Sequence, residues 1–234
     1  MPETTADHTP PTRRAQRRAA TIAEIKSHAR QQLATDGTGG LSLRGIAREM
    51  RMSPAALFRY FDNQSTLITA LCVDSYDALT AAMTAAQEIG TGPAEQWSAG
   101  CAAARRWALA NPAEFALING TPIPGYQAHP EETGPAAGRL MAAVATPYLA
   151  AVAQGAADPT ATLVPALAAG PLLGGDSMEP TPVPGILVNA WASVLGFIAG
   201  ETFGSIAALI ADPDELFRGH VRTVMHGMGF REQS

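Results

Sequence analysis

Apolar residues recur with the spacing of α-helices along most of the chain. Ile22, Ile25, Ala29 and Leu33 form one apolar stripe on a helix predicted over residues 15–34. No stretch alternates convincingly between apolar and polar residues, as a half-buried strand does. The pattern therefore predicts an all-α fold. The further helices it predicts cover residues 63–88, 94–110, 113–119, 135–154, 157–168, 186–210 and 213–228.

Glycine and proline separate these helices. Asp36–Gly40 and Gly90–Pro93 are short stops, whereas Gly120–Gly134 and Gly170–Gly185 are predicted loops, the second exposed and mobile. Residues 1–12 are polar and contain three prolines, so we expect a disordered tail.

Two short helices are expected between residues 42 and 61. Ser42 is a good N-cap for the first, and Ser53-Pro54 is a restart signal for the second, because serine caps a helix and proline fits its first position. The apolar face of the first comprises Leu43, Ile46, Ala47 and Met50, and that of the second Leu57 and Phe61. Met50–Ser53 is long enough only for a turn. This is the pattern of a helix-turn-helix, whose second helix enters the DNA major groove.

The second helix carries side chains suited to DNA. Pro54, Ala55 and Ala56 are small enough for the backbone to approach base edges. Arg59 can bind a guanine edge or a phosphate, and Tyr60 has a hydroxyl for phosphate. Spacing alone equally fits an ordinary helical hairpin with solvated arginines.

Charge is divided unevenly along the chain. The net charge of −5 argues against a nucleic-acid binder. Residues 13–61, however, hold ten Lys and Arg against three acids, a net +7, whereas the chain from Leu71 onward is at −9. A basic segment joined to an acidic body fits a DNA-binding domain fused to another domain. The cluster of Arg13, Arg14, Arg17 and Arg18 is either an arm for phosphates or the minor groove, or a solvated helix face.

The run Ile22–Leu71 resembles the DNA-binding domain of the tetracycline-repressor (TetR) family of bacterial transcription regulators. Ile46-Ala47, Ser53, Leu57 and Tyr60-Phe61 fall where the family pattern has them. The departures are Arg51 at a usual Gly in the turn, Phe58 at a common phosphate-binding Tyr, and Gln64 at a common Lys. Losing that hydroxyl and that cation should alter affinity for DNA or its salt dependence.

The resemblance implies a DNA-binding domain over residues 13–62 and a ligand-binding and dimerisation domain over residues 63–234. The residues expected at the DNA are Arg13, Arg14, Arg17, Arg18, Ser42, Arg44, Ser53, Pro54, Ala55, Ala56, Phe58, Arg59, Tyr60 and Gln64.

The C-terminal part also resembles family material. PAEFALIN, at residues 112–119, is similar to the start of the ligand-binding domain in a subgroup with a Trp-His-Gly signature. Here Leu195-Gly196 stands at the His-Gly part and Trp191 lies four residues earlier, so the signature is broken. The family implies that the last two helices pair with those of a second subunit. The residues expected at that dimer interface are Ile198, Phe203, Ile206, Ile210, Val221 and Met225.

Aromatic and Met side chains on the C-terminal helices suggest the walls of an apolar cavity for a small molecule. The candidate ligand-binding residues are Trp97, Cys101, Trp107, Phe115, Asn119, Met141, Tyr148, Trp191 and Phe197. Asn189 and Glu201 are further polar groups for such a cavity. The alternative is that these side chains only fill the core.

No motif supports an enzyme, a cofactor or a metal site. HExxH, GxSxG and phosphate-loop patterns are missing, and the five histidines have no ligand spacing. Cys72 and Cys101 fit small buried groups in a reducing cytoplasm. Residues 186–210 are long enough to span a bilayer, but Asn189 and Glu201 interrupt them, and we expect no membrane partner.

These observations predict a cytoplasmic homodimer that regulates transcription. It binds double-stranded operator DNA as a repressor and is released by a small apolar or amphipathic effector. The alternatives are a ligand-independent architectural DNA-binding protein, which would need no cavity, and a helical enzyme, which would need a carboxylate or histidine constellation.

Overall fold

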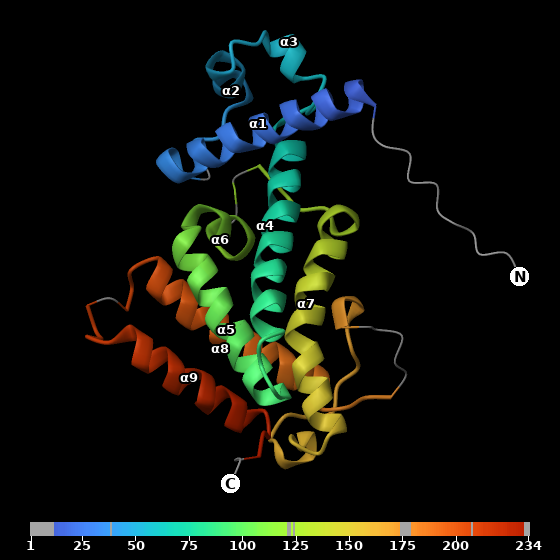
Figure 1. Ribbon diagram of the computed structural model, residues 1–234, viewed down its shortest axis with the longest axis vertical. Coiled ribbons are helices and arrows are strands. Elements are labelled where there is room, and N and C mark those ends of the chain that lie inside the picture. The colour runs from blue at the N-terminus through green and yellow to red at the C-terminus, as the bar shows by residue number, and fades with distance from the viewer. Residues whose placement is uncertain are drawn as a thin grey trace, which may run out of the picture. The chain divides into compact units, whose positions relative to one another are not determined.

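The computed structural model describes residues 12–37, 39–120, 123, 125–173, 179–206 and 208–231. The described part of the chain is helical, as predicted, and extended pairing within it is limited to two isolated bridges, Ala157–Phe230 and Leu167–Thr181 (Figure 1). The chain divides into two compact units, Met1–Leu67 and Ile68–Ser234, with the boundary inside one helix, α4 (Gln64–Gln87). The tail expected over residues 1–12 lies outside the described residues except for Thr12.

The first unit begins with α1 (Arg13–Asp36), which buries Ile25, Ala29 and Leu33. The Thr12 hydroxyl accepts a hydrogen bond from the Ala15 backbone N at 3.2 Å, so α1 starts two residues before the predicted helix. Arg13 and Arg14 therefore lie on the first turn of α1, in the same helix as Arg17 and Arg18, which were already predicted to be helical. The helix ends at Gly37, whose φ of +71° suits glycine.

Two short helices, α2 (Leu43–Glu49) and α3 (Pro54–Leu57), complete the predicted helix-turn-helix. Both capping serines act as expected: the Ser42 hydroxyl accepts from the Gly45 N at 3.1 Å, and the Ser53 hydroxyl from the Ala56 N at 3.2 Å. The apolar residues expected to face inward, Ile46, Leu57 and Phe61, are buried.

The second unit contains the rest of α4, α5 (Pro93–Ala110), α6 (Pro112–Asn119), α7 (Pro130–Ala153), α8 (Val183–Thr202) and α9 (Pro213–Gly227). The α5 helix packs against α7, α8 and α9, and α9 also packs on α8 (Figure 1). Their shared core includes Trp97, Phe115, Tyr148 and Ile186.

Three helix predictions are corrected. Helix α7 begins at Pro130 instead of Pro135, because Pro130 fits a first helical position and Glu131 and Glu132 lie in the positively polarised first turn. Residues 157–168 hold only the short 3-10 helix η1 (Pro159–Ala161). The Asp158 carboxylate accepts from the Thr160 backbone N at 3.0 Å, and Pro165 cannot donate to a continued helix.

The third correction concerns α8, which spans Val183–Thr202 rather than residues 186–210. Gly204 adopts a φ of +81°, so the chain turns away directly after the helix. Ile206 and Ile210 therefore lie in the connection to α9 and not on a long dimerisation helix.

Both α7 and α8 are long and apolar enough to cross a membrane by length and composition alone. Each also has a face that is buried in the core of the second unit, through Tyr148 on α7 and Ile198 on α8. The core helices of globular domains have the same composition, so this likeness is weak evidence for a membrane span.

Candidate nucleic-acid interface and effector region

The N-terminal end of α3 presents small side chains to the outside. Leu57 anchors the helix in the core of the first unit, while Pro54 and Ala55 are exposed and Ala56 is half-buried. This leaves the start of α3 free of bulky groups, as close approach to base edges requires.

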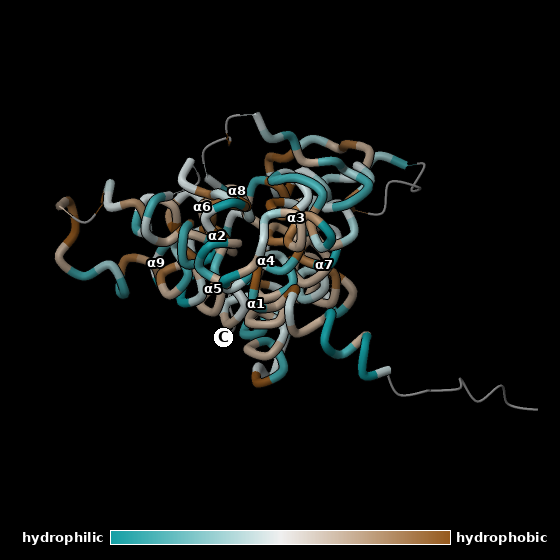
Figure 2. The backbone as a smooth tube through the Cα atoms, turned by 90° about the horizontal axis from the view of Figure 1, so that it is seen from above, coloured by the Kyte–Doolittle hydropathy of each residue, from teal (hydrophilic) through white to brown (hydrophobic). Residues whose placement is uncertain are grey.

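The first turns of α1 lie beside α3. The Arg18 Nη1 donates to the backbone carbonyl of Arg59 at 3.3 Å, and its guanidinium lies 5.1 Å from the centre of the Tyr60 ring. Figure 2 shows this N-terminal end of α1 as strongly hydrophilic. The structure thus brings together two groups that lie about forty residues apart in the sequence, the arginine cluster and the residues after α3.

A concavity of about 740 Å³ forms between them. Its lining residues are Thr12, Arg13, Arg14, Ala15, Arg17, Arg18, Thr21, Met52, Ala56, Arg59 and Tyr60. We call this surface the arginine concavity. Five guanidinium groups around one hollow make it attractive to phosphates.

A hydrogen-bond network joins α1 to α2 elsewhere in the first unit. The Gln32 side chain accepts from the Ser42 N at 3.0 Å and donates to Glu49 at 3.1 Å, and His28 lies 3.1 Å from the same carboxylate. The Ser42 hydroxyl is engaged as a cap, and Arg44 is exposed on α2. Phe58 is 41% exposed, and Gln64 is exposed at the first position of α4.

Most of the expected effector residues belong to the core of the second unit or pack against it. Trp97, Cys101, Phe115, Tyr148 and Trp191 are buried in one contiguous cluster. Trp107, Met141 and Phe197 are half-buried and pack against that cluster, and Asn119, at the end of α6, is also half-buried.

The Tyr148 hydroxyl is engaged, donating to the Met228 carbonyl at 3.0 Å. Burial raises the pKa of Tyr148 to about 12, and burial also raises the pKa of Cys101. Both side chains are therefore held within the packed core of the second unit.

Met141 instead lines a groove of about 510 Å³ between α7, α8 and the segment 163–173. Leu167, Leu172 and Leu173 also line it, and Asn189 contributes one amide. An adjoining hollow of about 270 Å³ shares Met141 and Leu172. We call the groove of about 510 Å³ the strap groove. It could not be read from the sequence because three separate segments build it.

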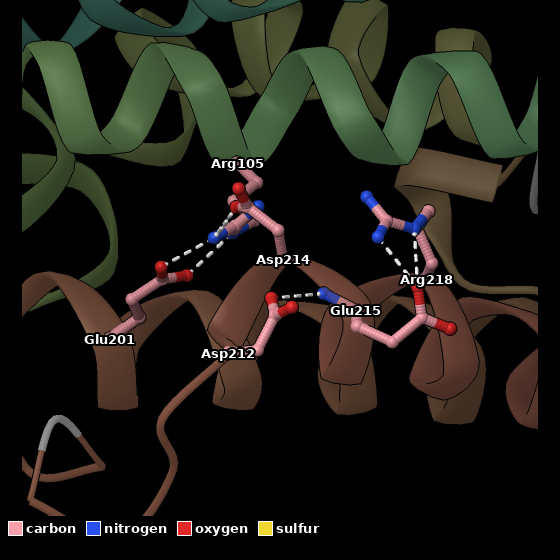
Figure 3. Close-up of polar contacts among 6 residues, drawn as sticks. All are labelled: Arg105, Glu201, Asp212, Asp214, Glu215 and Arg218. Carbon is pink, nitrogen blue, oxygen red and sulfur yellow. Dashed lines mark hydrogen bonds and ion pairs between the residues drawn. The ribbon is translucent and has the colours of Figure 1, made fainter.

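Glu201 was expected to be a polar group facing a cavity, but it pairs with Arg105 of α5 (Figure 3). Two hydrogen bonds of 2.6 Å join the guanidinium to the carboxylate, and Asp214 of α9 lies 2.7 Å from the same guanidinium. Hydrogen bonding to Glu201 raises the pKa of Arg105 above its ordinary value. The cluster ties the end of α8 and the start of α9 to α5.

The expected dimer residues have different surroundings. Ile198 and Val221 are buried within the chain itself, so they do not present a surface to a second copy. Phe203 is 51% exposed, but its ring packs 5.9 Å from that of Phe115. The Met225 sulfur accepts a hydrogen bond from the Ser98 hydroxyl at 3.1 Å.

Comparison with known proteins identifies both halves of the chain. Residues 25–71 match the family described as bacterial regulatory proteins, tetR family. Residues 97–224 match the tetracyclin repressor-like C-terminal domain. The HTH-type transcriptional regulators Rv1816 of Mycobacterium tuberculosis and Mb1846 of Mycobacterium bovis are each 33% identical over 220 residues, which cover 87% of this chain and 90% of the relative.

Solved structures agree in fold. The regulatory protein SCO4313 is 31% identical with a TM-score of 0.73, covering 92% of this chain and all of its own. A protein of unknown function from Rhodococcus sp. RHA1 is 23% identical with a TM-score of 0.70, covering 97% of this chain and all of its own. RolR, solved with resorcinol, is 16% identical with a TM-score of 0.55, covering 89% of each chain.

Proposed function

Because the chain belongs to the tetracycline-repressor family of DNA-binding transcriptional regulators, we propose that it is a cytoplasmic repressor whose dimer leaves its operator when a small apolar or amphipathic effector binds. Residues 13–62 bind DNA in this proposal, and residues 63–234 bind the effector and a second copy. The observation that carries the DNA part is the arginine concavity beside the exposed start of α3.

In this mode α3 enters the major groove with Pro54, Ala55 and Ala56 closest to the bases. Arg59 then binds a guanine edge or a phosphate, and the α1 arginines bind the flanking backbone. Arg18 is held by the Arg59 carbonyl and the Tyr60 ring, so it also positions the residues after α3.

A dimer would form through the outer faces of α8 and α9. Ala192 and Gly196 lie four residues apart on one face of α8, and both are exposed and uncharged. A side chain built at Gly196 would meet nothing within 4 Å in the single chain. Glycine inside an exposed helix face is costly, so its presence there suits close approach by another helix.

The strap groove is the effector site that we propose. Its volume of about 510 Å³ is in the range of small-molecule pockets, and its walls are aliphatic with one amide, from Asn189. This chemistry suits an apolar molecule with one hydrogen-bonding group. RolR, which has the same fold, was solved with the small aromatic ligand resorcinol.

Selection of random-sequence duplexes with the full-length chain tests the DNA part. We expect the selected duplex to bind about 10³-fold or more tightly than a random one at physiological salt, the lower end for specific binding. An architectural protein would instead bind both duplexes alike.

The effector part is tested by heating the chain with a compound panel. A compound that binds the native state raises the midpoint of unfolding and, if it is an effector, releases the selected duplex. Leu172→Asp should abolish that shift because Leu172 lines the strap groove. The matched change Leu163→Asp, at a fully exposed leucine of the same segment, should keep it. Equal shifts in both variants would place the site elsewhere.

A further inference from the structure

The turn between α2 and α3 contains an unusual backbone conformation. Arg51 has a φ of +55° and is the only non-glycine residue with positive φ among those that the structure describes. The Met52 N donates to the Ala47 carbonyl at 2.8 Å, and the Arg51 N donates to the Arg48 carbonyl at 3.1 Å. These two bonds form a Schellman motif that ends α2, with Arg51 at the left-handed position where glycine is usual.

An arginine is disfavoured at this position. Its Cβ crowds the following carbonyl in the left-handed region, whereas glycine has no such penalty. The side chain is exposed, and no hydrogen bond or ion pair engages its guanidinium within the described part of the chain. No hydrogen bond or ion pair of the guanidinium with the described residues therefore offsets the strain, and strained residues of this kind tend to lie at functional sites.

The surroundings of Arg51 indicate what the side chain does. Residues 53–58 carry no charge, so the start of α3 has no cation of its own. Arg51 precedes the Ser53 cap by two residues, and its neighbour Met52 lines the arginine concavity. When the start of a recognition helix enters the major groove, the turn before it comes close to the sugar-phosphate backbone at the groove edge.

We propose that the Arg51 guanidinium binds a DNA phosphate beside the start of α3, and that the left-handed turn directs the side chain there. The inference rests on the proposed binding of DNA through α3. Arg51 is then a further cationic contact with the DNA. It precedes α3 in the sequence, whereas Arg59 follows it, so the two arginines would hold the helix in the groove from both ends.

Salt titration of binding to the selected duplex tests this with the full-length chain. Arg51→Gln should lower the slope of log affinity against log salt by about 0.9, the contribution of one phosphate contact in B-DNA. Its affinity deficit should therefore shrink about threefold between 50 and 200 mM salt. Arg51→Lys should keep the wild-type slope, because the charge remains. Arg106→Gln, a change of equal charge at an exposed site of α5, should leave the slope unchanged.

Arg51→Gly separates this role from helix capping. Glycine suits the Schellman position, so the variant should unfold at or above the wild-type temperature while losing the same slope as Arg51→Gln. If Arg51→Gln and Arg51→Gly both bound with the wild-type slope, Arg51 would serve only to end α2, and the inference would be wrong while DNA binding stood. A wild-type chain that bound no duplex would overturn the proposed function together with this inference.

Discussion

Single side chains determine the charge and shape of the DNA-facing surface. Arg59 is exposed next to α3 and lines the arginine concavity, while its own carbonyl is held by Arg18. The backbone of Arg59 is thus fixed within the unit and its guanidinium is left for a ligand. This division of roles between one residue's backbone and side chain makes Arg59 a good site for mutation.

Arg59→Ala should weaken binding to the selected duplex without unfolding the chain. If Arg59 binds a guanine edge, the loss should be about 1–3 kcal/mol and specificity should relax at one base pair. If it binds a phosphate, binding to all DNA sequences should weaken equally, and the slope of log affinity against log salt should fall by about one. Band-shift titrations over a salt series measure both, with Arg106→Ala as control. Wild-type affinity across the series would show that Arg59 does not contact DNA.

Tyr148 predicts a pH dependence of stability. Burial raises its pKa from 10.0 to about 12, so above pH 10 the unfolded chain loses this proton while the folded chain keeps it. The free energy of unfolding should therefore fall as pH rises from 10 to about 12.

Tyr148→Phe should show a shallower fall of the free energy of unfolding over this pH range. It should also lose about 1–3 kcal/mol at pH 7, because the Met228 carbonyl loses its donor. Denaturant unfolding at several pH values measures this, and identical slopes for the two proteins would contradict it.

At the scale of elements, the capped helices were predictable and the connections between them were not. Ser42 and Ser53 marked helix starts because capping is local, depending on residues within three positions. On α4, however, Ala78 is exposed, while its neighbour Leu79 is buried. The buried row of α4 includes Leu71, Ser75 and Leu79. Ser75 is polar, and its hydroxyl donates to the carbonyl of Leu71, so the row does not stand out as an apolar pattern in the sequence.

The residues of the candidate sites were likewise only partly predictable from the sequence. The residues of α3 and the arginine cluster could be read from local sequence. The strap groove and the Arg105 cluster could not, because each joins segments that are far apart in the chain. Membership of the subgroup with the Trp-His-Gly signature stays a prediction.

The two carboxylates that pair with Arg105, Glu201 and Asp214, should contribute unequally to the free energy of unfolding. Arg105 and Glu201 are 12% and 13% exposed, whereas Asp214 is 68% exposed. Arg105→Met should cost about 3–5 kcal/mol, because it leaves Glu201 as a buried unpaired charge. Asp214→Asn should cost less than about 1 kcal/mol, as expected for an exposed partner. Urea unfolding at pH 7 gives both values. Similar costs for the two variants would show that burial does not govern the cluster.

At the scale of the whole molecule, the charge separation noted in the sequence coincides with the division into two units. The basic residues 13–61 belong to the first unit, and the acidic stretch from Leu71 onward belongs to the second. An acidic second unit repels DNA, which favours contact through the first unit alone. Two copies are needed in this account, since one short α3 offers few base contacts.

Ala192→Arg should convert the dimer to a monomer, because it places a charge in the middle of the proposed α8 face. Ala81→Arg, at an exposed alanine of α4, is the matched control and should remain dimeric. Sedimentation equilibrium measures both variants. If Ala192→Arg sedimented as a dimer and bound DNA with wild-type affinity, the two copies would contact each other through another surface.

Footprinting of the selected duplex tests the central claim, that two copies of α3 read one operator. The account predicts two protected half-sites related by a two-fold axis, about 10–10.5 base pairs apart from centre to centre, with two chains bound per duplex. Arg59→Ala should remove protection at both half-sites together. A single protected site, or uniform protection of unrelated duplexes, would contradict the account.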